Sequence, residues 1–163
     1  MISKADFCTY IKKHENAMYA VAYSIVKNEH DASDAVGEAI LKAYARLDTL
    51  KNPEAFKTWI LRIVHNEAVE LIRKITPTVE IEEAYDVPIE HTESKHTEKI
   101  DLHKAMEKLP QPYRTVITLY YYEELPMTAI AEITDTSTIS VRQQLSRGRK
   151  QLRQMLKEDF LHE

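Results

Sequence analysis

Glycine, cysteine and long apolar runs are all scarce in this sequence of 163 residues. Gly37 and Gly148 are its only glycines, and tight hairpin turns and left-handed backbone positions favour glycine. Isolated glycines also exclude the closely spaced glycine motifs that hold the phosphates of dinucleotides and nucleoside triphosphates. Because residues that favour helices are abundant instead, the composition predicts an all-α protein without a nucleotide cofactor.

The single cysteine, Cys8, excludes an internal disulfide and a zinc site built from neighbouring thiolates. The seven histidines show no metal-ligand spacing either, so we expect no metal and no other cofactor. No stretch of about 18 apolar residues occurs, and the amino terminus lacks a basic segment that leads into an apolar one. The chain is therefore expected in the reducing cytoplasm, without direct membrane insertion.

Charge is distributed unevenly along the chain, whose formal net charge is -4. Residues 127–157 hold six basic side chains against two acidic ones, whereas residues 76–101 hold eight acidic side chains against two lysines. Lysine and arginine gathered on one segment supply the phosphate contacts that dominate binding to nucleic acid. The carboxy-terminal segment is therefore the candidate for DNA binding in spite of the negative total.

Apolar residues recur at helical spacing in three segments of the amino-terminal half. Ser3 is placed to cap the first helix, and Asp31 is the predicted cap of the second. Asn52 followed by Pro53 is a typical start for the third. The predicted helices cover 3–26, 31–47 and 53–73. Together they predict a helical domain at residues 1–75.

Helical periodicity fails after this domain, where Pro77 and Pro88 stand among acidic side chains. Residues 76–94 are therefore predicted to form a flexible acidic linker, followed by a second helical domain at residues 95–163. The predicted helices of this domain cover 95–109, 113–123, 127–134 and 138–161. The last two, with three residues between them, match a DNA-binding helix-turn-helix.

The final predicted helix has one apolar face and one basic face. Its apolar side chains recur at steps of three and four residues, which is typical of a buried stripe. They are Val141, Leu145, Gly148, Leu152 and Met155. Charge alone favours a merely solvated basic face on the other side, but the preceding helix and turn favour a DNA-binding surface.

Position within this helix separates two kinds of contact. Residues near the start of a recognition helix point into the major groove, where arginine, glutamine and serine can hydrogen-bond to base edges. The candidates for base contacts are Arg142, Gln143, Ser146 and Arg147. The candidates for phosphate contacts follow later in the helix and are Arg149, Lys150 and Arg153.

Two further groups of residues lie in the amino-terminal domain. The third helix combines aromatic, amide and cationic side chains, the mixture that stacks on unpaired bases and follows a phosphate backbone. They include Phe56, Trp59, Arg62, His65 and Asn66. For Phe56 and Trp59, core packing is the more common role of such side chains. In the second helix Asp34, Glu38 and Leu41 share a face, which forms either a solvated edge or an acidic surface for a basic partner.

Three blocks of the sequence carry a family resemblance when they are taken in order. They are DASDAVGEAILKAYARL, PEAFKTWILRIVHNEAVELIRK and LPQPYRTVITLYYYEELPMTAIAEITDTSTISVRQQLSRGRKQL. In this order they resemble the extracytoplasmic-function sigma factors, the smallest group of the sigma-70 family, over nearly the whole chain. The resemblance implies two all-helical domains, sigma region 2 and sigma region 4, in a transcription initiation factor that is not an enzyme.

The resemblance implies roles for the residues named above. Such a factor binds core RNA polymerase at its clamp and flap, directs it to promoter DNA, and reads the minus-ten and minus-thirty-five elements. The implied clamp contacts are Asp34, Glu38 and Leu41. The implied minus-ten contacts, which capture and open the DNA, are Lys42, Phe56, Trp59, Arg62, His65 and Asn66. The implied minus-thirty-five contacts are Ser140, Arg142, Gln143, Ser146, Arg147, Arg149 and Lys150.

Two positions depart from the family pattern. Gly37 stands where the family usually has glutamine, beside the implied clamp contacts. Asp135 stands in the turn where the family commonly has glycine, and aspartate tolerates a left-handed backbone better than most residues. The family also implies an anti-sigma factor that masks the polymerase-binding surfaces, and a membrane-bound inhibitor of this kind would hold the chain at the membrane.

Three other functions remain open at this point, and none of them involves a small-molecule substrate. A helix-turn-helix repressor explains the final helix but not the amino-terminal blocks, and it typically binds palindromic sites as a dimer. A nucleic-acid hydrolase would use the acidic cluster with magnesium and show metal-dependent turnover. A helical adaptor predicts no loss of DNA affinity when Arg142 and Arg147 are replaced by alanine.

Overall fold

The computed structural model describes residues 2–75 and 102–161, with side chains up to residue 157. In this part of the chain the residues form helices and turns without a strand, which confirms the predicted all-α class. The predicted linker, residues 76–94, lies outside the described residues. So does the first part of the helix predicted at 95–109.

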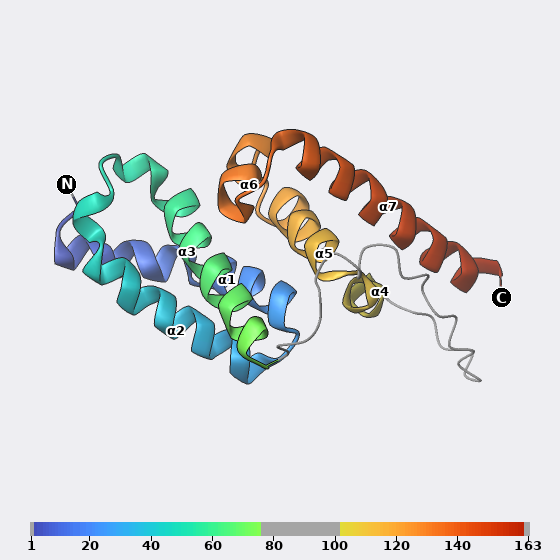
Figure 1. Ribbon diagram of the computed structural model, residues 1–163, viewed down its shortest axis with the longest axis horizontal. Helices are drawn as coiled ribbons and strands as arrows, with labels where there is room; N and C mark the ends of the chain where they lie inside the picture. The colour runs from blue at the N-terminus through green and yellow to red at the C-terminus, as the bar shows by residue number, and fades with distance from the viewer. Residues whose placement is uncertain (1, 76–101, 162–163) are drawn as a thin grey trace.

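The amino-terminal unit has three long helices (Figure 1). Helix α1 is Lys4–Val26, α2 is Glu29–Ala45 and α3 is Phe56–Ile75. Two 3-10 turns, Leu47–Thr49 and Pro53–Ala55, lead from α2 to α3. Each of the three helices packs against the other two, so they form a small bundle.

Polar side chains set the starts of these helices. Ser3 caps α1 as predicted, because its hydroxyl accepts a hydrogen bond from the backbone N–H of Asp6 at 3.1 Å. The predicted Asp31 cap of α2 is wrong: Asn28 accepts from the backbone N–H of Asp31 at 3.0 Å. Asn28 has the extended backbone that a cap requires, and Asp31 lies in the first turn, where a negative charge favours the helix dipole. Asn52 caps the turn before α3 as predicted.

The carboxy-terminal unit has four α-helices and one π-helical turn. They are α4 Leu102–Lys108, α5 Gln111–Ile117, the turn Thr118–Tyr122, α6 Met127–Thr134 and α7 Thr138–Leu161. The helix predicted at 113–123 therefore begins earlier, because Pro112 fits the first turn of α5, where its missing N–H has no partner to lose. Helices α6 and α7 have the predicted bounds.

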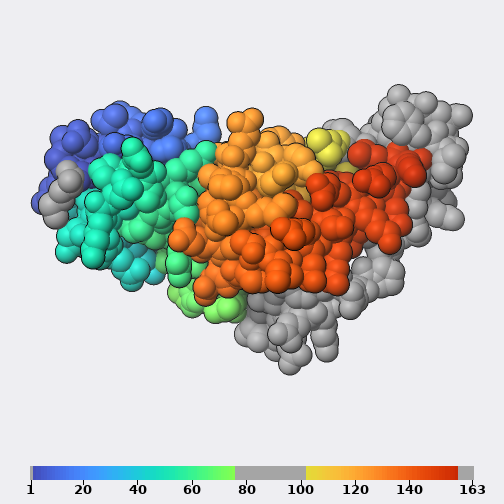
Figure 2. All heavy atoms as spheres, turned by 90° about the horizontal axis from the view of Figure 1, so that it is seen from above, coloured from blue at the N-terminus to red at the C-terminus, as the bar shows by residue number. Residues whose placement is uncertain are grey.

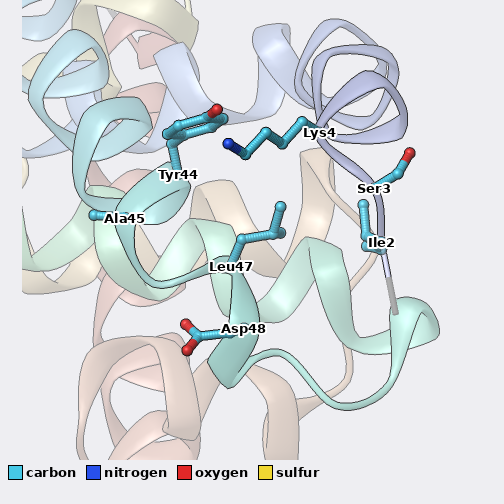
Figure 3. A pocket seen from close by; sticks show the side chains of 7 residues that line it. All are labelled: Ile2, Ser3, Lys4, Tyr44, Ala45, Leu47 and Asp48. Carbon is cyan, nitrogen blue, oxygen red and sulfur yellow. The ribbon is translucent and has the colours of Figure 1, made fainter.

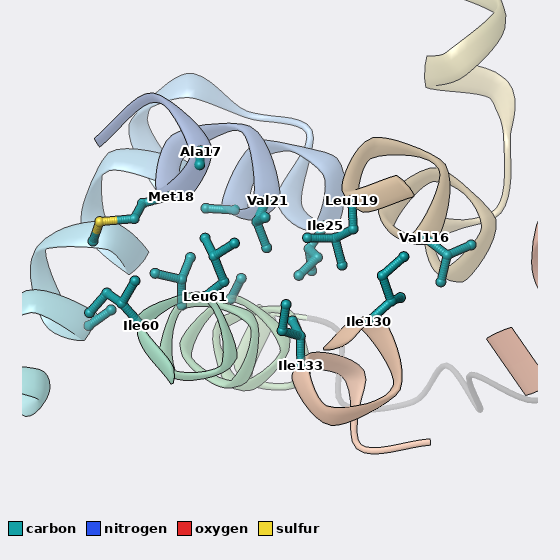
Figure 4. Close-up of a cluster of buried hydrophobic side chains, with 14 of the residues drawn as sticks. Ala17, Met18, Val21, Ile25, Ile60, Leu61, Val116, Leu119, Ile130 and Ile133 are labelled. Atoms are coloured by element: carbon teal, nitrogen blue, oxygen red, sulfur yellow. The ribbon is translucent and has the colours of Figure 1, made fainter. Parts of the chain in front are cut away.

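The two units pack against each other around one apolar core. Helix α6 lies on α3, and α5 lies on α1. In Figure 4, side chains from both units point into the same space. Those of α1, α3 and α6 include Val21, Ile25, Leu61, Ile130 and Ile133, and all of them are buried. Figure 2 shows orange atoms of the carboxy-terminal unit meeting green and teal atoms of the amino-terminal unit directly, so the described helices form one body.

Candidate nucleic-acid interface

Helix α7 turns its apolar stripe inward and its basic face outward. Val141 and Leu145 are fully buried, and Gly148 is buried against α5. A Cβ atom at Gly148 would stand 2.7 Å from Ile117 Cδ1 and 3.2 Å from Tyr113 Cβ, so only glycine allows α7 to approach α5 this closely. On the other face, the predicted DNA contacts are exposed except for Ser140, which is half-buried. The exposed ones are Arg142, Gln143, Ser146, Arg147, Arg149 and Lys150.

The turn before α7 fixes where the helix begins. Asp135 has a φ of 55° and adopts the left-handed conformation, which is consistent with glycine being common at this position in the family. Ser137 then accepts a hydrogen bond from the backbone N–H of Ser140 at 3.1 Å, which satisfies a donor in the first helical turn. Among the described residues neither Arg142 nor Arg147 makes an ion pair. Their guanidinium groups are therefore available to an anion.

The aromatic start of α3 belongs to the core. Phe56 is 1% exposed, and its ring lies 5.0 Å from the ring of Tyr10 and 5.7 Å from those of His14 and Trp59, measured between centroids. The core-packing alternative therefore describes Phe56 in this arrangement, and a base cannot reach its ring. Trp59 is half-buried and keeps part of its surface in solvent.

The middle of α3 lies under the turn that precedes α7. Arg62 Nη2 is 4.0 Å from Asp135 Oδ1, with half of the Arg62 side chain exposed. Burial lowers the pKa of His65, although its contact with Asn66 and the charge of Asp135 act in the opposite direction. The His65 Nδ1 and Asn66 Oδ1 atoms are 3.5 Å apart. Of the implied minus-ten residues, Arg62 therefore meets the other unit at Asp135, and His65 is half-buried and close enough for the charge of Asp135 to act on it.

Lys42 of α2 contacts α3 at Glu67. Its Nζ atom is 2.5 Å from Oε1 of Glu67, the neighbour of Asn66 in the chain. Both Lys42 and Asn66 are exposed. The ion pair between Lys42 and Glu67 thus joins α2 to α3 at the residue that follows Asn66 in the chain.

The implied clamp contacts lie on the outer face of α2. Asp34, Glu38 and Leu41 are all exposed, and Leu41 is 67% exposed although it is apolar. Tyr44 continues the face and is 45% exposed. A Cβ atom added at Gly37 would meet nothing within 4 Å, so the glutamine of related proteins fits there without a clash. We refer to Asp34, Glu38, Leu41 and Tyr44 as the α2 surface.

Comparison with known proteins assigns both units of the chain. Residues 10–77 match the family described as Sigma-70 region 2, and residues 99–152 match the family described as Sigma-70, region 4. The chain belongs to the extracytoplasmic-function sigma factors of the sigma-70 family. Its function is accordingly promoter recognition and transcription initiation with RNA polymerase, as the resemblance implied.

Several relatives of this sigma factor align along nearly their whole length. It is 36% identical to the RNA polymerase sigma factor SigV of Bacillus subtilis over 159 residues, which are 97% of this chain and 96% of that protein. Identity to SigW of the same species is 28% over 179 residues, covering 96% and 94%. The sigma factor RpoE of Bartonella quintana, solved with the anti-sigma factor NepR, has a TM-score of 0.74 at 25% identity and covers 93% of this chain and 97% of its own. CnrH, solved with the cytosolic domain of CnrY, shares the fold with a TM-score of 0.68 at 21% identity, covering 96% and 91%.

An open cavity of about 380 Å³ adjoins the α2 surface of the sigma factor (Figure 3). Its lining consists of Ile2, Ser3, Lys4, Tyr44, Ala45, Leu47 and Asp48. The ammonium group of Lys4 is 5.5 Å from the centroid of the Tyr44 ring, which is a cation–π distance. The lining has no histidine or cysteine to act as a base or nucleophile. Within residues 2–75 and 102–161, no cluster of three or more His, Cys, Asp or Glu side chains is suited to hold a metal ion.

A buried arginine joins the two units of the sigma factor, and sequence reasoning missed it. Arg114 of α5 is 6% exposed. Its Nε donates to the backbone oxygen of Ser24 in α1, and its Nη1 donates to the backbone oxygen of Leu109. Burial lowers the pKa of Arg114 to about 10, while Glu107 and Tyr23 act in the opposite direction. The side chain therefore stays charged at neutral pH.

Other polar contacts surround this arginine. The hydroxyl groups of Ser24 and Thr115 are 3.0 Å apart. Glu107 accepts from the Tyr23 hydroxyl at 3.1 Å, and its backbone oxygen accepts from Lys27 Nζ at 2.9 Å. We call these contacts the polar seam. It consists of Tyr23 and Ser24 of α1 and the following Lys27, with Glu107, Arg114 and Thr115 of the carboxy-terminal unit.

The described helices of the sigma factor offer no membrane span. None of them is both long and apolar enough to cross a bilayer. The longest, α1 and α7, carry charged residues along their exposed faces. A charged face of this kind is typical of helices at a protein surface.

Proposed function

We propose that α7, in a carboxy-terminal domain at residues 95–163, reads the minus-thirty-five element. Base contacts come from Arg142, Gln143, Ser146 and Arg147, and phosphate contacts from Ser140, Arg149, Lys150 and Arg153. The supporting observation is that the basic face of α7 is exposed along its length while the opposite face is buried. A bidentate arginine contact to a base contributes about 1–3 kcal/mol of discrimination.

The amino-terminal domain, residues 1–75, reads and opens the minus-ten element in this proposal. Lys42 and Asn66, which are both exposed, hold a flipped base, and Trp59, Arg62 and His65 follow the unpaired strand. Unstacking a base costs a few kcal/mol, and contacts to the unpaired base offset that cost. Opening is therefore a consequence of binding, and the sigma factor needs no covalent reaction of its own.

Reading both elements requires the two units to separate. The element names place the two sites about 25 base pairs apart, or about 85 Å of B-form DNA. In the described arrangement Asp135 touches Arg62 of α3. Helix α7 begins three residues after Asp135, which is at most about 11 Å along the chain. The start of α7 therefore lies close to α3, far short of the distance between the two elements. The 26 residues from 76 to 101 span at most about 90 Å when fully extended, which is enough for the separated form.

The α2 surface is the proposed contact with the polymerase clamp, and the carboxy-terminal domain is the proposed contact with the flap. An exposed Leu41 between carboxylates suits a partner that offers both apolar and basic side chains. RpoE of Bartonella quintana, which was solved with the anti-sigma factor NepR, supports a protein inhibitor as the further partner. We place the sigma factor in the cytoplasm, where a membrane-bound inhibitor would hold it near the membrane.

Run-off transcription with core RNA polymerase tests the proposal. Genomic DNA fragments are transcribed with and without the sigma factor, and with the double variant Arg142→Ala, Arg147→Ala. We expect discrete start sites that depend on the sigma factor and fall at least about tenfold with the double variant. The double variant Lys12→Ala, Arg46→Ala removes two exposed positive charges elsewhere and keeps full activity. Equal activity of both double variants would remove α7 as the reader.

A further inference from the structure

The first turn of α7 carries an apolar side chain that the proposed contacts do not use. Ile139 is the second residue of the helix and is 66% exposed. Within residues 138–157, the part of α7 whose side chains are described, every other large apolar residue is buried or half-buried. Ile139 therefore contributes little to the core on which α7 lies.

Helical geometry places Ile139 at the centre of the reading face. A step of about 100° per residue puts it about 160° away from the buried Val141. Gln143 follows four residues later and Ser146 seven residues later, so both lie on the same line along the helix. We call Ile139, Gln143 and Ser146 the reading stripe. Of the three, Ile139 is nearest the helix start, which enters the major groove most deeply.

An isoleucine at this position has no advantage for folding. Its branched side chain lowers helix propensity compared with alanine or lysine, and its surface remains in water. In the major groove only one base feature is apolar, the C5 methyl group of thymine. Phosphate oxygens offer no favourable contact to a hydrocarbon side chain. The reading stripe thus combines two side chains that can hydrogen-bond to bases, Gln143 and Ser146, with one apolar side chain, Ile139, that suits a thymine methyl group.

We propose that Ile139 is a specificity-determining residue, which packs on the methyl group of a thymine in the minus-thirty-five element. The proposal rests on α7 being the reader of that element. Loss of one buried methyl contact corresponds to about a fourfold loss of affinity. Discrimination of this size selects thymine over cytosine at one position, next to the bases that Gln143 and the arginines read.

Substitution of thymine by deoxyuridine tests the contact, because it removes only the methyl group and keeps base pairing and the O4 acceptor. Upstream duplexes that contain the minus-thirty-five element of a promoter found by run-off transcription are titrated with holoenzyme, and each thymine of both strands is replaced in turn. We expect about a fourfold loss at one thymine position for the wild type. The Ile139→Ala variant should bind the thymine duplex about fourfold more weakly and show no further loss with deoxyuridine there.

Two controls keep the outcomes separate. Ile75→Ala removes an isoleucine of similar exposure, 58%, outside α7 and should bind like the wild type. Ile139→Val keeps the branched Cβ and should retain most of the discrimination. Equal deoxyuridine effects in the wild type and Ile139→Ala, or no effect at any thymine, would overturn the role of Ile139. If the Arg142→Ala, Arg147→Ala variant also bound the duplex normally, α7 itself would not be the reader, which is a failure of the proposed function rather than of the methyl contact alone.

Discussion

Helices α3 and α7 carry the two sets of proposed DNA contacts, and they differ in how accessible those contacts are. On α7 the proposed base-reading side chains all face solvent. On α3, Phe56 is in the core, His65 is partly buried, and Arg62 meets Asp135 of the other unit. The described arrangement therefore leaves the proposed duplex contacts of α7 accessible, whereas part of the proposed strand-opening contacts of α3 is buried or in contact with the other unit.

The difference suggests an order of events. A factor whose α7 is exposed can meet duplex DNA before its units separate, because that helix needs no rearrangement. If α3 captures the unpaired strand as proposed, α6 and the turn at Asp135 have to move away first. In the proposed function, contacts with core polymerase hold the two units at the spacing of the two elements and would supply the free energy for that movement. Changes to the contacts between the units test this order.

The largest effect is expected from Arg114→Met in the polar seam. The change removes the buried donor that reaches the backbone oxygen of Ser24 in the other unit, which destabilises the closed arrangement by about 1–3 kcal/mol. The population of separated molecules should rise about tenfold, since each 1.4 kcal/mol is a factor of ten. Energy transfer between dyes at the exposed Cys8 and at a Gln154→Cys substitution measures the separation.

A second arginine variant, outside the polar seam, serves as the control for this measurement. Arg46→Met removes an exposed arginine and should leave energy transfer unchanged. Affinity for a single-stranded minus-ten oligonucleotide should rise in Arg114→Met and stay constant in Arg46→Met. If Arg114→Met keeps the wild-type energy transfer, the seam does not hold the units together.

A smaller effect is expected at Asp135, where the two units meet. Valine does not tolerate the left-handed backbone at this position, so Asp135→Val should lower the free energy of unfolding by about 1–2 kcal/mol. Glycine relieves the backbone strain and loses only an exposed ion pair worth about 0–1 kcal/mol, so Asp135→Gly should stay close to the wild type. Urea unfolding of both variants measures the difference. Equal losses would show that the ion pair, not the backbone, sets the role of Asp135.

The smallest effect concerns pH. Burial lowers the pKa of His65 in the closed form, so the folded state binds fewer protons than the unfolded state near pH 6. The stability of the closed form is therefore unaffected by His65 above pH 6.5, the ordinary pKa of histidine. It decreases as the pH falls from 6.5 through the lowered pKa of His65. We expect the closed form to be less stable at pH 5.5 than at pH 7.5. NMR titration should find the pKa of His65 below 6.5 in the wild type and nearer 6.5 in Arg114→Met, and an unchanged value would contradict the covering of α3.

The faces of α7 could be predicted because sequence spacing alone defines them. Val141, Leu145 and Gly148 recur at helical steps, and the structure buries all three. The start of α2 was predicted wrongly at Asp31, because Asn28 and Asp31 are both good caps by residue type and only the backbone angles of Asn28 decide between them. The left-handed turn at Asp135 could be expected from the family resemblance, because glycine is common at this position and aspartate tolerates the left-handed backbone better than most residues.

The joining of the two units could not be predicted in the same way. Apolar spacing indicates which side chains are buried, but not which helix covers them. Helices α3 and α6 pack together, although Leu61 of α3 and Ile133 of α6 are 72 positions apart. Arg114 lies in an apolar stretch of the sequence, where its charge gave no hint of a buried role. Its partner is a backbone oxygen of Ser24, and backbone groups leave no trace in the amino-acid pattern. The roles of the proposed DNA and clamp contacts stay predictions.

The core shared by α1, α3, α5 and α6 links the state of this sigma factor to temperature. Separation of the units exposes side chains such as Leu61 and Ile133 to water, and exposed apolar surface raises the heat capacity. Because apolar burial weakens on cooling, the closed arrangement loses part of its advantage in the cold. Lower temperature should therefore shift the free protein toward the separated form, before DNA, polymerase or an inhibitor takes part.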